Sequence, residues 1–138
     1  MELTIKNNCI MAKLIIDATK NKIFLMFIDN NSKYNINYEN SKTNYEKLVL
    51  LINQFLRSKN LELKKISEIY VNRGPGSFAG IRNTLSIAKA LKITNNTDYY
   101  CFSFEDFDNK LDIKYENIPD LCEKFQVKKN LINPIYMS

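Results

Sequence analysis

Three glycines mark the part of this chain where the backbone could bind a ligand or pack closely against another backbone. Gly74, Gly76 and Gly80 are the only glycines among 138 residues, and Arg73 and Arg82 flank them. At an average usage of ~7%, a chain of this length would contain about ten scattered glycines. Their clustering indicates a backbone with positive φ, or a group that packs too close to tolerate a Cβ.

A phosphate is one group that could approach so closely. A glycine loop ahead of a helix presents free N–H groups and the positive end of a helix dipole. The loop lacks the Gly-Lys-Ser/Thr of a Walker A motif, but Gly74-x-Gly76-x-x-Ala79 matches a dinucleotide fingerprint, with Glu105 or Asp106 placed for a ribose contact. That fingerprint belongs to the first strand–helix turn of its fold, whereas three strands precede it here. A nucleotide-binding enzyme of kinase or dehydrogenase type therefore stays the alternative.

A second backbone is the other candidate, and we expect the glycine turn to let backbones approach one another between subunits. The helix predicted over residues 80–91 places small side chains, Ser86 and Ala90, on its outer face, where a neighbouring helix could pack. Its inward residues are predicted to be Ile81, Thr84, Leu85, Ala88 and Leu91. Its outward residues are predicted to be Arg82, Asn83, Ser86, Lys89 and Ala90.

The absence of histidine from the whole chain removes most catalytic chemistry. Histidine-based acid–base catalysis, Ser-His and Cys-His nucleophile pairs and nearly all zinc sites are excluded.

Ser77 has no base beside it, so we expect it to form hydrogen bonds within the loop. Asp17 could face a metal or phosphate, but we expect it to end a strand and accept turn N–H groups. Arg82 opposes the helix dipole and predicts a carboxylate partner, internal or across an interface.

Composition and charge describe an ordinary globular chain. The mass is 16.2 kDa, the net charge is +5, and no ~18-residue apolar run or signal-peptide pattern is present. Three cysteines, Cys9, Cys101 and Cys122, lack metal-type spacing and fit a reducing cytosol as buried fillers. The scattered lysines favour a composition effect over a nucleic-acid surface. We expect a cytoplasmic protein with no membrane partner and no cofactor.

The elements that position these residues follow from hydrophobic patterning. Strands are predicted at residues 12–17, 23–29 and 33–39 as an antiparallel meander, then at 68–72 and 99–103, with helices at 44–59, 80–91 and 119–126. The order β-β-β-α-β-α-β predicts an α/β fold with later strands parallel. The apolar stripe of the first helix is predicted to contain Tyr45, Leu48, Val49, Leu51, Ile52, Phe55 and Leu56. Leu50 lies opposite, among Glu46, Gln54 and Arg57.

The stretch NRGPGSFAGIRNTLSIAKAL resembles the signature G-x-G-P-G-S-F-T-G-L/V-R-x-G-x-x-x-A-K/Q-G-L of the TsaB (YeaZ) family, partners in making threonylcarbamoyladenosine on tRNA. LIIDATKNK resembles the family's opening L-A-I-D-T-S, and NPIYM its closing P-x-Y-L. The resemblance implies an ASKHA fold, the actin/RNase H-like architecture, and a degenerate paralogue of the transferase subunit TsaD that is itself no enzyme. It departs from the family at Asp17-Ala18-Thr19, which replaces Asp-Thr-Ser, and at Ala90-Leu91, which replaces Gly-Leu.

The resemblance also implies partners and a domain plan. It implies that the chain would form a heterodimer with TsaD through its helices, that TsaE would join the assembly and that tRNA would be contacted indirectly. In isolation the chain could form a homodimer through the same face. We expect a flexible extension at 1–10, an ASKHA-like lobe at 11–103, and a reduced second lobe with a C-terminal return segment at 104–138. The expected partner-binding residues are Glu46, Leu50, Gln54, Arg57, Arg82, Asn83, Ser86 and Ala90. The expected structural loop comprises Gly74, Pro75, Gly76, Ser77 and Gly80.

Overall fold

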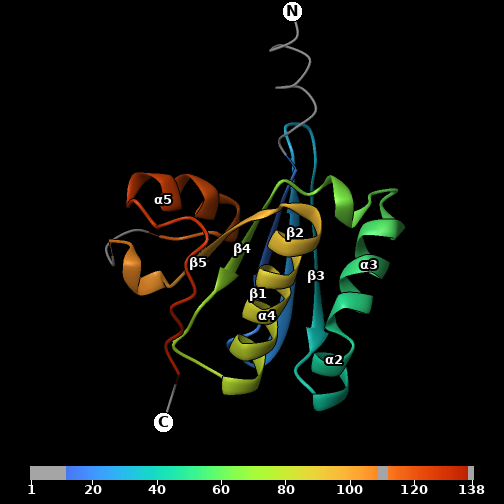
Figure 1. The fold of residues 1–138 in the computed structure, drawn as a ribbon, viewed down its shortest axis with the longest axis horizontal. Helices are drawn as coiled ribbons and strands as arrows, with labels where there is room; N and C mark the ends of the chain where they lie inside the picture. Colours follow the sequence, from blue (N-terminus) through green and yellow to red (C-terminus); the bar gives the residue numbers. More distant parts are fainter. Residues whose placement is uncertain (1–11, 109–111, 137–138) are drawn as a thin grey trace, which may run out of the picture.

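The computed structural model describes residues 12–108 and 112–136, so the predicted extension at 1–10 and Cys9 lie outside the described residues. One five-stranded sheet has the order β3-β2-β1-β4-β5 (Figure 1). Its strands are β1 (Lys13–Asp17), β2 (Lys22–Ile28), β3 (Lys33–Glu39), β4 (Glu68–Asn72) and β5 (Asp98–Phe102). β1, β2 and β3 pair antiparallel, whereas β4 pairs parallel with β1 and with β5. The predicted α/β meander is confirmed.

Helices cover one face of the sheet. They are α2 (Lys42–Glu46), α3 (Leu48–Ser58) and α4 (Phe78–Asn95), with the 3₁₀ turn η1 (Leu63–Lys65) after α3. Figure 1 shows α4 across the sheet and α3 beside it on the β3 side. All five inward residues predicted for α4 are buried. Burying large apolar side chains stabilises a fold by ~1.5–3 kcal/mol each, so this layer holds the helices in fixed positions.

The chain after β5 covers the opposite face. This region contains η2 (Phe104–Asp106), η3 (Tyr115–Asn117) and α5 (Ile118–Lys124), and Pro119 lies in the first turn of α5 as predicted. Its apolar side chains pack with sheet residues into a second core cluster formed by Ile15, Met26, Tyr70, Phe102, Phe107, Ile118 and Cys122. The central strands are therefore buried on both faces, as parallel strands require.

The helix predicted over 44–59 is wrong in one respect: it is two helices that meet at Lys47. The shorter one begins after Ser41, whose hydroxyl accepts the Asn44 N–H. Val49, predicted in the buried stripe, is 48% exposed because it faces a groove floored by the small side chains of α4. In the described ranges, no helix is long and apolar enough to cross a bilayer.

The glycine turn brings α4 against the turn that follows β1. A Cβ on Gly76 would collide with the carbonyl oxygen of Thr19, and one on Gly80 would collide with that of Ala18. The Ser77 N–H also donates to the Thr19 carbonyl at 2.9 Å. The first turn of α4 therefore lies directly on backbone, at a separation that only glycine permits.

The first glycine of the turn contacts the C-terminal segment. Gly74 has φ of +114°, and a Cβ there would collide with the carbonyl oxygen of Ile135. The Ile135 N–H donates to the Arg73 carbonyl at 2.7 Å. The predicted close approach of backbones is thus present, but the backbones around the glycines belong to this same chain, which corrects the expectation of a contact between subunits.

We predict that Gly80→Ala lowers the free energy of unfolding by about 1–3 kcal/mol, because the new methyl group collides with a backbone carbonyl. In an open helix the same change would stabilise by up to ~1 kcal/mol. Urea denaturation measures the effect. Ser86→Ala, on the exposed side of the same helix, is the control and should stay within ~0.5 kcal/mol of wild type. A Gly80→Ala chain as stable as the control would contradict this packing.

Candidate functional site

A groove of about 450 Å³ runs between α4 and the helices α2 and α3, within the helical layer that covers one face of the sheet. α4 contributes its small and apolar side chains, and the opposite wall comes from α2, α3 and η1. The lining residues are Tyr45, Glu46, Leu48, Val49, Ile52, Leu63, Asn83, Ser86, Ile87, Ala90, Leu91 and Thr94. Ser86 and Ala90 are small, so neither side chain projects far from α4 into the groove.

Large apolar side chains are exposed on α3 and α4, the two longer helices that form the groove. Val49 is 48% exposed, Leu50 is 52% exposed and Ile93, one turn beyond Lys89 on α4, is 77% exposed. Val49 lines the groove itself, whereas Leu50 and Ile93 are exposed outside its lining, as scattered single apolar residues ordinarily are. The arrangement suits a helix of another molecule, whose side chains would enter the groove between α3 and α4.

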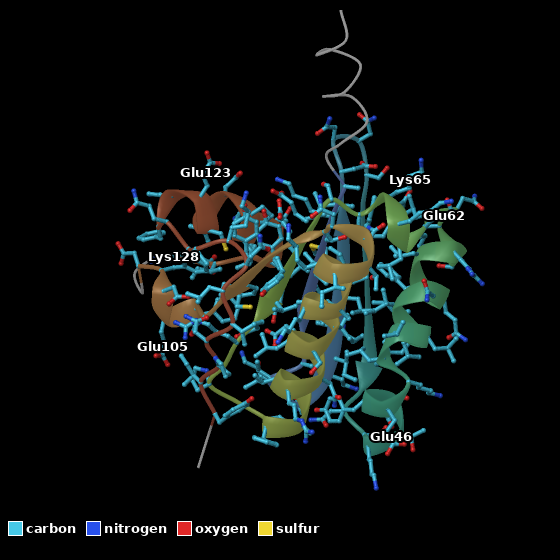
Figure 2. The ribbon with its side chains drawn as sticks, in the orientation of Figure 1. Glu46, Glu62, Lys65, Glu105, Glu123 and Lys128 are labelled. Carbon is cyan, nitrogen blue, oxygen red and sulfur yellow. The ribbon has the colours of Figure 1, made fainter. Side chains whose placement is uncertain are left out.

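The predicted partner-binding residues fall into two groups. Glu46, Asn83, Ser86 and Ala90 line the groove. Figure 2 shows Glu46 on the side of the molecule away from Glu105 and Lys128. The others, which are exposed but do not line the groove, are Leu50, Gln54, Arg57 and Arg82. The set predicted from the sequence is therefore a mixture of the groove and the outer surfaces beside it.

Arg82 has no carboxylate partner among the residues that the structure describes. The arginine that does form an ion pair is Arg73, whose Nη2 lies 2.6 Å from Oδ1 of Asp106. Its Nη1 also donates to the Asn133 carbonyl at 3.0 Å. Asp106 was considered for a ribose contact, but it holds Arg73 and the Ser103 N–H instead. Separation along the chain hides such a pair from sequence reasoning.

Asp17 is the most completely bonded polar side chain of the sheet. It is 2% exposed at the end of β1, and Oδ1 accepts the Thr19 N–H at 2.9 Å and the Thr19 hydroxyl at 2.6 Å. Oδ2 accepts from Asn72 at 3.0 Å and from the Tyr115 hydroxyl at 2.5 Å. The expected bond to a turn N–H is confirmed, whereas the contacts with Asn72 and Tyr115 were not predicted.

Adjacent parallel strands explain the Asn72 contact. β1 and β4 end at the same edge of the sheet, so Asp17 and Asn72 meet there, and Asn72 in turn accepts the Gly74 N–H at 2.9 Å. Burial, and then the charge of Asp17, raises the pKa of the Tyr115 hydroxyl well above its ordinary value. The phenol therefore stays protonated as a donor to the carboxylate rather than acting as a base.

The other candidate nucleophiles, Ser77, Cys101 and Cys122, either form a structural hydrogen bond or are buried. Ser77 is the N-cap of α4 and accepts the Gly80 N–H at 3.3 Å, which is the loop role predicted for it. Cys101 and Cys122 are buried, and burial raises the pKa of each thiol to about 12. Thiols of this kind are unreactive at neutral pH, because the thiolate is the nucleophile.

We predict that Tyr115→Phe destabilises the chain by about 1–3 kcal/mol, because it removes one of the two donors to Oδ2 of the buried Asp17 carboxylate. Chemical denaturation followed by circular dichroism measures the change. Tyr136→Phe is a matched control, since Tyr136 is 42% exposed. Equal stability of the two variants would show that the Tyr115–Asp17 contact contributes little.

The sequence of this chain is similar to that of known proteins. A family model described as TsaD, tRNA N6-adenosine threonylcarbamoyltransferase, matches residues 38–103. The tRNA threonylcarbamoyladenosine biosynthesis protein TsaB of Buchnera aphidicola subsp. Baizongia pistaciae is 32% identical over 85 residues, which are 60% of this chain and 38% of that protein. This chain thus spans well under half the length of that relative.

Solved structures share the fold. YeaZ from Pseudomonas aeruginosa superposes with a TM-score of 0.62 at 16% identity, over 67% of this chain and 44% of that chain. A second Pseudomonas aeruginosa structure, of a protein with similarity to peptidase YEAZ, also gives 0.62 at 16% identity, over 67% and 43%. The predicted ASKHA-like architecture is confirmed. With the signature at residues 72–91, these similarities confirm the resemblance of this chain to the TsaB (YeaZ) family.

Proposed function

We propose that this chain is a non-catalytic partner subunit in threonylcarbamoyladenosine biosynthesis, which binds TsaD and activates threonylcarbamoyl transfer to tRNA. The observation that carries the proposal is the apolar groove between α3 and α4, on a chain related to TsaB. Contacts with TsaE and tRNA would follow from that assembly rather than from a site on this chain alone.

The groove supports helix docking on geometric grounds. Its floor at Ser86 and Ala90 lets a second helix approach closely, and its walls at Val49 and Ile87 offer apolar contacts. A helix from TsaD placed there would pack its ridges into the groove between α3 and α4. Each buried apolar side chain would add to the affinity in proportion to the area removed from water.

A non-catalytic role agrees with the chemistry of the candidate residues. The chain has no histidine for a general base or a metal site. Asp17 is held by four hydrogen bonds from its own chain, and Ser77 caps a helix. The groups that could react are thus engaged in structure, and the transferase chemistry would come from TsaD.

We predict that Ala90→Arg and Leu50→Asp each abolish co-purification with TsaD while the isolated chain stays folded. The arginine would fill the groove, and the aspartate would place a charge on the exposed apolar surface beside it. Leu131→Asp is the matched control, because Leu131 is 44% exposed on the C-terminal segment, away from α3 (Figure 1). Wild-type binding by both helix variants would show that TsaD docks elsewhere.

The alternative, a nucleotide-binding enzyme that uses the glycine turn, has less support from the geometry. The space beside Gly74, Gly76 and Gly80 is filled by carbonyl groups of this chain. We therefore expect calorimetric titration of the isolated chain with ATP, ADP or NAD to give no binding heat. Micromolar binding of any of the three would favour the alternative and contradict the proposed role.

A further inference from the structure

The two edges of the sheet differ: one is covered by the chain itself and the other is open. The edge of β5 is covered by the chain itself, since Tyr100 forms a bridge with Lys129 and Asn130 exchanges hydrogen bonds with Tyr99. β3 forms the other edge, and no strand in the described part of the chain lies beyond it. Its outer row of backbone N–H and C=O groups is a template for another strand.

β3 also lacks two of the devices that usually protect an open edge, a bulge and a proline, and it carries charged residues only at its two ends, Lys33 and Glu39. Its register with β2 runs without interruption from Lys22–Glu39 to Ile28–Lys33, so it contains no bulge, and its sequence KYNINYE contains no proline. Both features leave the strand regular enough to accept a neighbour, although the Glu39 carbonyl at its end already accepts from the Ser41 N–H and the Asn44 side chain.

The sequence of β3 reads nearly the same in both directions about Ile36. In an antiparallel pair of two copies centred on that residue, Lys33 of each copy would face Glu39 of the other. Likewise Tyr34 would face Tyr38, Asn35 would face Asn37, and Ile36 would face itself. Opposite charges and matched aromatic or amide groups directly across a strand pair are stabilising.

The two faces of β3 are compatible with this register. Tyr34, Ile36 and Tyr38 are half-buried beneath the helical layer, whereas the alternate residues are exposed on the other face. Residues directly opposite each other in an antiparallel pair point to the same face. The half-buried face of one copy would therefore continue into that of the other, as would the exposed face.

We propose that two copies of this chain associate through β3 about a two-fold axis at Ile36, forming one continuous sheet. The pairing is self-complementary, as a closed two-fold dimer requires. Lys33 now contacts Glu116 at 2.5 Å, and that pair is about half exposed, with side-chain exposures of 47% and 40%. An exposed pair of this kind holds a side chain weakly, so Lys33 can also face Glu39 of the second copy.

This interface is separate from the groove that the proposed function uses, because no residue of β3 lines that groove. The isolated chain is sufficient for its test, with no TsaD present. Self-association and TsaD binding can thus succeed or fail independently of one another.

Charge variants give the sharpest test. In Glu39→Lys, both cross-strand charge pairs become Lys–Lys, and in Lys33→Glu both become Glu–Glu. Each variant alone should therefore self-associate at least about tenfold more weakly than wild type, measured by sedimentation velocity at low salt. A mixture of the two variants restores both opposite-charge pairs and should recover the heavier species.

Ala90→Arg serves as the control for the helical face and should dimerise like wild type. Three results would overturn the proposal: a wild-type chain that stays monomeric at its highest soluble concentration, charge variants that dimerise as well as wild type, or loss of the dimer in Ala90→Arg with retention in Glu39→Lys. The last result would assign self-association to the helices.

The register has its own test in a Cys9→Ser background. Ile36→Cys places one cysteine opposite its copy, within the ~4.4–6.8 Å Cα separation that a disulfide needs. It should give a covalent dimer on mild oxidation. Asn37→Cys lies opposite Asn35, so its sulfurs are too far apart in this register and should remain uncrosslinked. Equal crosslinking of both variants would contradict pairing about Ile36.

Discussion

The close packing of the glycine turn against the turn after β1 is the constraint on which the outer surface depends. Gly76 and Gly80 lie against the carbonyl groups of Thr19 and Ala18, with no room for a Cβ at either glycine. This contact fixes the start of α4 on the sheet, and α4 supplies one wall and the floor of the groove. The position of the candidate docking surface thus follows from backbone contacts buried beneath it.

A second set of contacts joins the segment after β5 to the same region. Asp17 receives hydrogen bonds from Asn72 on β4 and from Tyr115 in the segment that follows β5. Arg73 reaches both Asp106 and the carbonyl of Asn133. The carboxyl ends of β1 and β4, where enzymes of open α/β folds often bind ligands, are thereby occupied by the chain's own side chains.

Local patterns in the sequence were sufficient to predict most of the strands and helices of the fold. The alternation in β3 and the inward stripe of α4 were predicted residue by residue, since periodicity reports burial directly. The break at Lys47 was missed, and so was the exposure of Val49, which depends on the small side chains that α4 places opposite it. The pairs Asp17–Tyr115 and Arg73–Asp106 were missed for a related reason: only the folded chain brings their members together. Within the candidate site, the small residues of α4 were found and the carboxylate expected for Arg82 was not.

A methyl NMR titration of the labelled chain with unlabelled TsaD tests the docking surface most directly, because it reports each apolar side chain separately. The account predicts that the signals of Val49, Leu50, Ile87 and Ile93 shift or broaden as TsaD is added. The signals of Leu131 and Ile132 on the C-terminal segment should stay unchanged. Perturbation confined to the C-terminal segment, or none at all with active TsaD, would contradict it.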